Sequence, residues 1–229
     1  MWRFALILAL AGTALGYSQA PMGLFNGSDD IGKTKKGESV YDGASKSYRV
    51  TGGGADVWFA EDDFHFVWVK LAGDVELTAD VAFTPQPAQP LAKAMLMVRQ
   101  SLEPGSAYAD VAIHADGHVT LQWREKAGGQ TSDLTAALHN SKTLRIERKG
   151  DSFTAYVTKP DGSMEAFGTQ TLPMTGDVYV GLGVCAHDAD GLATVTFSMA
   201  ASAPCLIAAK ESETEAPLVS EAERLVAAI

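Results

Sequence analysis

Residues 108–125 read YADVAIHADGHVTLQWRE, and this stretch decides the fold class. Apolar and polar side chains alternate on both sides of Asp116-Gly117, which is the pattern of two antiparallel strands joined by a tight turn. A two-residue turn would set each apolar row against a polar row, whereas a three-residue loop from Ala115 to Gly117 aligns apolar with apolar. We therefore predict the three-residue loop.

This register predicts a sheet with one apolar face and one polar face. It sets Asp110 opposite Gln122 and Tyr108 opposite Arg124. The preceding strand aligns on the same grounds and brings Arg99 beside Tyr108. Because antiparallel sheets commonly bury one face and solvate the other, we expect the apolar face to be core and the polar face to be exposed.

The rest of the chain repeats this pattern, with short alternating runs separated by Gly, Asp and Pro and no long helical period between Ser28 and Met199. That predicts an all-β antiparallel sandwich or barrel over residues 28–200, followed by a polar, acidic tail over 206–229 with a short helix from Ser220. The predicted strands are Tyr48–Val50, Val57–Phe59, Phe64–Leu71, Asp74–Phe83, Ala94–Gln100, Ala107–His114, His118–Glu125, Thr143–Arg148, Phe153–Thr158, Val178–Ala186 and Ala193–Ser198.

The first twenty residues have the layout of a secretory signal peptide: Arg3, an apolar run from Phe4 to Leu15, then small residues. Cleavage after Ala20 or after Gly16 fits, and an uncleaved anchor is the alternative. The run is shorter than the roughly 20 residues that span a bilayer. We expect a secreted or periplasmic protein without membrane insertion after signal cleavage.

The net charge of the chain limits the classes of partner that we expect. The chain has 18 basic and 28 acidic residues, a net charge of −10. Nucleic acids and anionic lipids attract basic surfaces, so neither fits this chain. A glycan or a protein partner is expected instead.

The polar face supplies the candidate ligand-binding residues. Guanidinium and amide groups, a carboxylate and an aromatic ring are the set with which proteins bind sugars, whose hydroxyls need donors and acceptors and whose C–H face needs a ring. An ordinary solvated sheet face is the competing interpretation. The candidates are Arg99, Tyr108, Asp110, His114, Gln122 and Arg124.

Metal-site and disulfide signals are weaker. Asp188 and Asp190 echo the start of a calcium loop but lack its length and its distal Glu, so a plain turn is the alternative and no cofactor is expected beyond that calcium option. The predicted loop also sets His114 opposite His118, but two ligands are too few for a metal site. A bridge from Cys185 to Cys205 stays open against a free, buried Cys185.

Several segments together resemble one family, the regulator-of-enolase-type domain of the concanavalin A-like lectin and glucanase group. They are VTGGGADVW (50–58), DFHFVW (63–68), GDVELTADV (73–81), MVRQS (97–101) and YVGLGVC (179–185). The resemblance covers residues 29–199 and implies a jelly-roll sandwich with a carbohydrate-linked or envelope role. It implies a free Cys185 and carries over no catalytic residues.

Three hypotheses follow. The first is an exported, non-catalytic lectin-like protein that binds a glycan on the polar face. The second is a glycoside hydrolase or lyase with Asp110 as acid or base, which needs a second carboxylate about 5–9.5 Å away. The third is an envelope protein-interaction module, which would favour an exposed apolar patch.

Overall fold

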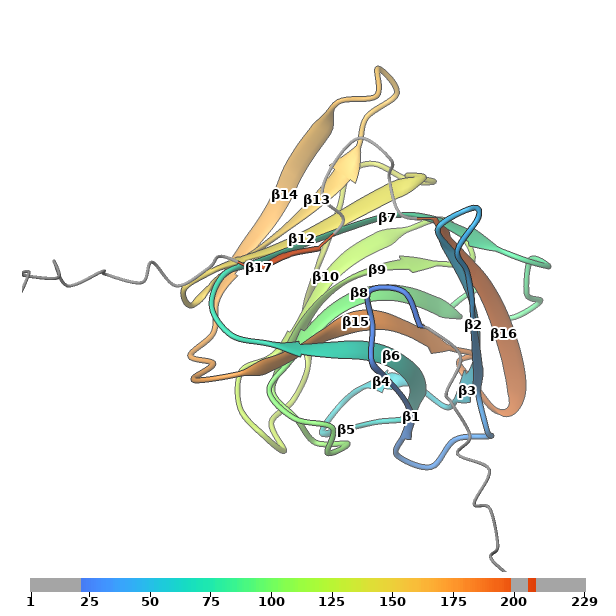
Figure 1. Cartoon of the computed structure of the whole chain (residues 1–229), viewed down its shortest axis with the longest axis horizontal. Helices are drawn as coiled ribbons and strands as arrows, with labels where there is room; N and C mark the ends of the chain where they lie inside the picture. Colours follow the sequence, from blue (N-terminus) through green and yellow to red (C-terminus); the bar gives the residue numbers. More distant parts are fainter. Residues whose placement is uncertain (1–21, 199–205, 209–229) are drawn as a thin grey trace, which may run out of the picture.

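The computed structural model describes residues 22–198 and 206–208, and these form a sandwich of two large antiparallel sheets (Figure 1). The first sheet has seven strands. In spatial order they are β1 (Gly27–Ile31), β6 (Phe64–Leu71), β15 (Val178–Cys185), β8 (Lys93–Arg99), β9 (Tyr108–His114), β10 (Val119–Arg124) and β11 (Ser132–Thr135).

The second sheet has eight strands, of which one, β17 (Leu206–Ala208), pairs with β7 beside the main path. The spatial order of the others is β14 (Met164–Thr171), β13 (Ser152–Thr158), β12 (Thr143–Lys149), β7 (Val75–Phe83), β16 (Asp188–Ser198), β3 (Ser47–Gly54) and β2 (Glu38–Asp42). The predicted leader and the predicted helix from Ser220 lie outside the described residues.

The predicted register of the β9–β10 hairpin is confirmed. Asp110 pairs with Gln122, Tyr108 pairs with Arg124, and Arg99 of β8 pairs with Tyr108. The loop has three residues, and Gly117 adopts a φ of 91°, a left-handed conformation that glycine tolerates. The apolar face, with Val111 and Leu121, is fully buried between the sheets as core.

The strands that the pattern did not predict are mostly edge strands. β11 is exposed along its whole length, and β1, β2 and β14 each bury at most one residue. An edge strand packs little on either face and is kept polar, which discourages association with other chains. Such a strand has no apolar alternation for a sequence pattern to detect.

A short hairpin covers the outer face of the seven-stranded sheet. β4 (Val57–Trp58) and β5 (Glu61–Asp62) pair with each other and lie near β6 and β1, as Figure 1 shows. We call residues 55–63 the flap. Val57 packs into a second apolar cluster with Phe64, Met97 and Tyr108, on the opposite side of the sheet from the main core. The flap therefore turns part of an outer face into an interior.

No helix in the described part of the chain is long and apolar enough to cross a membrane.

Candidate functional site

The flap is held down by one buried carboxylate between two arginines. Asp62 accepts hydrogen bonds from Arg124 Nη1 at 2.9 Å and Nη2 at 2.6 Å, and Arg99 Nη2 lies 3.5 Å away. All three side chains are 0% exposed. Burial lowers the pKa of Arg99 to about 10, which still leaves it charged at neutral pH. We call these three residues the buried clamp.

Arg124 also joins the surrounding loops. Its guanidinium donates to the carbonyl oxygens of Trp58 at 3.0 Å, Phe59 at 3.2 Å, Ser106 at 2.9 Å and Gly129 at 3.1 Å. These carbonyls lie in the flap and in two separate loops of the chain. An arginine that was predicted to contact a ligand therefore positions the backbone of Trp58 instead.

Asp110 lies in the same buried layer and has no partner. Neither of its carboxyl oxygens makes a hydrogen bond within the described residues. Burial raises its pKa well above the usual range, an effect that Lys93 opposes and the charge of Asp62 reinforces. Burial therefore favours the protonated form of this carboxyl. An unpaired buried polar group is rare and costs stability.

The expected exposure of the polar face is wrong for all six candidates, since His114 and Gln122 are only 5% and 2% exposed. Arg99, Tyr108, Asp110 and Arg124 are all 0% exposed because the flap covers them. Direct contact between a ligand and these four side chains is excluded in this conformation. An acid–base role for Asp110 meets the same obstacle: Asp62 is close enough to affect its pKa, but both carboxyls are buried.

Where the flap ends, the same face opens into a cavity of about 210 Å³. Two of the predicted residues, His114 and Gln122, line it from β9 and β10. The flap, β8, β11 and nearby loops contribute the rest. We call this cavity the open pocket; its other lining residues are Asp56, Trp58, Leu91, Lys93, His118, Thr120, Asp133 and His187.

Lys93 forms the base of the open pocket. Its ammonium donates to Asp56 Oδ1 at 2.8 Å, to the Val57 carbonyl at 2.8 Å and to Gln122 Oε1 at 3.4 Å. The same ammonium lies 5.3 Å from the centroid of the Trp58 ring, a cation–π contact. Lys93 therefore uses its three donors inside the protein and holds Trp58 from below.

Two stacked histidines form one wall. The rings of His114 and His118 lie 3.7 Å apart and 16° from parallel. Burial lowers the pKa of His114 to about 3, and the neighbouring His118 and Lys93 add to the effect, so this imidazole stays neutral. Its Nδ1 is buried and has no hydrogen-bond partner within residues 22–198. His118 Nδ1 lies 2.5 Å from Asp116 Oδ1, which fixes the ring.

Backbone strain also occurs around the open pocket. His187, which lines it, has a φ of 52°, and Phe59, next to Trp58, has a φ of 44°. Left-handed backbone is costly for side chains other than glycine, and such strain is concentrated at functional sites. Strain and an unpartnered buried ring nitrogen therefore occur at one cavity.

Sequence reasoning found two of the ten lining residues. Trp58 carried one signal, since it follows the glycine run 52–54 and was expected to be the most exposed of the nearby aromatic residues. Asp133 lies on edge strand β11, which has no apolar pattern. Lys93 lies just before the predicted strand, so its place on the polar face went unrecognised.

The calcium candidates lie at the start of β16, where the register with β3 is interrupted between Asp188 and Ala193. Asp188 Oδ1 accepts a hydrogen bond from the Asp190 amide at 2.9 Å, and Asp190 lies 3.8 Å from Lys35 Nζ. Among the described residues no three His, Cys, Asp or Glu side chains converge as metal ligands. Cys185 is free and buried, as the resemblance implies, and Cys205 lies outside the part described.

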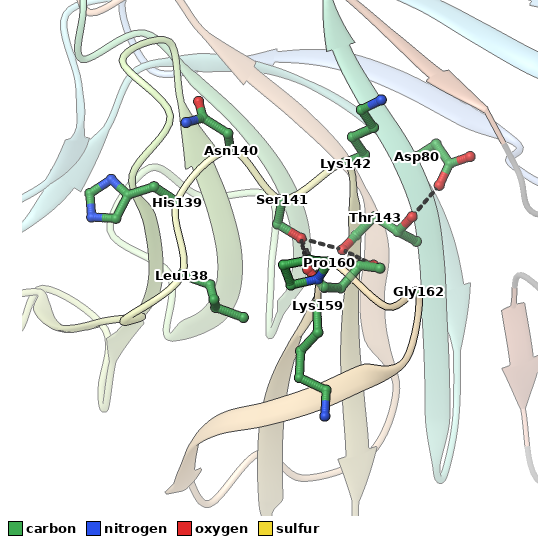
Figure 2. A pocket seen from close by; sticks show the side chains of 11 residues that line it. Asp80, Leu138, His139, Asn140, Ser141, Lys142, Thr143, Lys159, Pro160 and Gly162 are labelled. Atoms are coloured by element: carbon green, nitrogen blue, oxygen red, sulfur yellow. Dashed lines mark hydrogen bonds between the residues drawn. The ribbon is translucent and has the colours of Figure 1, made fainter.

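A second, larger cavity of about 440 Å³ lies between the loop before β12 and the turn after β13. Figure 2 shows that its two lysines, Lys142 and Lys159, point away from each other. The hydroxyl of Ser141 is bonded to the backbone carbonyl of Thr143, and Thr143 is bonded to Asp80. These polar groups are satisfied within the protein and do not converge, so this cavity is the weaker candidate.

Comparison with known proteins supports the fold. No family model matches the chain, and no curated protein matches its sequence. A functionally unknown protein from Saccharomyces cerevisiae has a similar structure, with a TM-score of 0.58 and 19% identity over 79% of this chain and 96% of that one. The predicted antiparallel β-sandwich is therefore confirmed, and the likeness concerns the fold alone.

More distant structural matches include a β-glucanase from Bacillus licheniformis, with a TM-score of 0.41 and 11% identity over 75% of this chain and 89% of that one. A lichenase from a mouse hindgut metagenome matches with a TM-score of 0.42 and 9% identity, over 77% and 94% of the two chains.

Proposed function

We propose that the protein is an exported carbohydrate-binding protein and that the open pocket is its sugar site. The observation that carries the proposal is the position of Trp58, half-buried at the wall of a cavity that also contains an amide and carboxylates. Sugars stack their C–H faces on aromatic rings and pair their hydroxyls with such groups.

The polar groups of the pocket complement hydroxyls in both directions. The Oε1 of Gln122 accepts a hydrogen bond from Lys93. Among the described residues no hydrogen bond engages its amide nitrogen, so the two N–H groups of that nitrogen are left as donors. Asp133 pairs with Gln122 across β10 and β11 and supplies an acceptor beside that donor. A donor and an acceptor a few ångströms apart suit adjacent hydroxyls of a pyranose.

Export and family are part of the same proposal. The leader-like residues 1–20 support secretion or a periplasmic location, and N-terminal sequencing of the protein recovered from its producing cells would test that. The resemblance to the regulator-of-enolase-type domain supports a carbohydrate-linked role. A glycan, rather than a protein, is the partner proposed.

The test compares two adjacent aromatic residues. Trp58→Ala removes the ring in the pocket, whereas Phe59→Ala removes a ring that is 65% exposed and does not line it. A glycan array identifies the ligand, and titration of that ligand should show binding at least about tenfold weaker for Trp58→Ala and unchanged for Phe59→Ala. Equal effects of the two variants, or no binding by folded protein, would overturn the proposal.

A further inference from the structure

The open pocket has more negative than positive side chains, and these differ in whether they are free to pair with a ligand. Asp56, Asp133 and Lys93 are its charged residues, two carboxylates and one ammonium. The Lys93 ammonium is 3% exposed and bonded to Asp56, to a carbonyl and to Gln122. Asp56 is paired with Lys93 and His187, so the charged side chain of the pocket that is left without an ion pair among the described residues is Asp133.

Asp133 is available in a way that Asp56 is not. It is exposed on edge strand β11, and within the described residues no hydrogen bond or ion pair engages it. Asp56 faces Lys93 at 2.8 Å and His187 at 3.5 Å. An uncompensated carboxylate at the mouth of a cavity favours a cation on the ligand.

The two arginines of the polar face, which would suit an acidic sugar, are buried. Arg99 and Arg124 are 0% exposed and bonded to Asp62 and to backbone carbonyls. A uronate or sulfate in the open pocket would meet Asp133 without a free guanidinium. The Trp58 ring, in contrast, offers a π face that also attracts cations.

We infer that the pocket selects an amino sugar, whose ammonium pairs with Asp133 while its ring stacks on Trp58. This inference rests on the proposed function and narrows its ligand class. The pairing is at an exposed position, so it adds selectivity rather than the bulk of the affinity, and salt should weaken it.

The experiment uses four oligosaccharides with the same linkage and length, built from glucose, N-acetylglucosamine, glucosamine and N,N,N-trimethylglucosamine. The trimethylammonium form stays charged at every pH, so binding can be measured at pH 8. Titration at low salt should show the trimethyl form binding roughly fivefold more tightly than the glucose form, with the difference shrinking in 0.5 M salt. Asp133→Asn should remove that preference and leave the affinity for the glucose form unchanged.

Asp177→Asn is the control, because Asp177 is a half-exposed carboxylate just before β15 that does not line the open pocket. It should keep the preference. Equal binding of all four sugars, lost in Trp58→Ala, would overturn the amino-sugar inference and leave the sugar site standing. Preference that survives in Asp133→Asn would also overturn it. Binding of none of the four, with a different glycan bound on the array, would overturn the inference alone, and a blank array would overturn both.

Discussion

The same three strands, β8 to β10, carry two polar regions, which differ in whether their side chains have hydrogen-bond partners inside the protein. In the buried clamp, Asp62 is paired with two arginines, and Arg124 also donates to five backbone carbonyls. In the open pocket, the amide nitrogen of Gln122 and the carboxylate of Asp133 have no partner among the described residues. A polar side chain with its bonds completed inside the protein supports structure, whereas one left incomplete beside a cavity can serve a ligand.

The largest expected effect is on the clamp. Asp62→Asn keeps the shape of the side chain and leaves two buried guanidinium groups without a counter-charge. Removing one member of a buried ion pair costs about 3–5 kcal/mol, a large share of the roughly 5–15 kcal/mol of a typical domain. Urea denaturation at pH 7 measures the loss, and sugar binding should weaken with it because Arg124 positions Trp58.

The matched control is an exposed pair. Asp190→Asn removes the carboxylate that lies 3.8 Å from Lys35, where both side chains are largely exposed. Such pairs contribute about 0–1 kcal/mol. If the free energy of unfolding changes by a similar amount in both variants, the clamp does not hold the flap and the contrast between the two regions is lost.

The next effect concerns Asp110. Its folded-state pKa is raised, so above pH 3.8 the unfolded chain loses a proton that the folded chain keeps. Stability from this group therefore falls as the pH rises toward the folded pKa, by about 1.4 kcal/mol per pH unit. Asp110→Asn removes the titration, so its stability relative to the natural protein should rise from pH 4.5 to pH 6.5 in urea titrations. Parallel stability curves would show that Asp110 is ionised and has a partner.

His114 should behave in the opposite direction. Its pKa is about 3 in the folded state against 6.5 for an ordinary histidine, so below pH 6.5 the unfolded chain binds a proton that the folded chain does not. Stability from this group is lost as the pH falls from 6.5 toward 3, again by about 1.4 kcal/mol per unit. His114→Gln should flatten the acid side of the stability curve. His139→Gln, at an exposed histidine, should leave it unchanged.

The fold and the register were predictable because they depend on burial. Alternation at Val111 and Leu121 set the core face, and alignment of the two apolar rows set the loop length, so the cross-strand neighbours of Asp110 and Tyr108 followed. The edge strands were not predictable, because strands exposed on both faces carry no such alternation. Of the ten residues that line the open pocket, two, His114 and Gln122, were predicted on the same grounds.

The prediction that failed was the solvent exposure of the polar face. A strand pattern indicates that Arg99 and Arg124 share a face, but not that a segment some forty to seventy residues earlier folds over them. The residues of the flap, with Trp58 and Asp62 among them, do resemble a strand and a turn. Their contacts with Arg124 join parts of the chain far apart in sequence, and local alternation contains no information about such contacts.

The smallest effect is at the flap tip, which connects the two regions. Phe59 has a φ of 44° and a side chain 65% exposed, while its carbonyl accepts hydrogen bonds from Arg124 and Thr131. Those bonds hold a conformation that costs a bulky residue about 1–2 kcal/mol. Asn tolerates the left-handed region better, so Phe59→Asn should be more stable than Phe59→Ala by roughly 0.5–1 kcal/mol in urea titrations. Equal stability would mean that the tip relaxes in solution, and Trp58 would then lack the fixed backbone that a sugar platform requires.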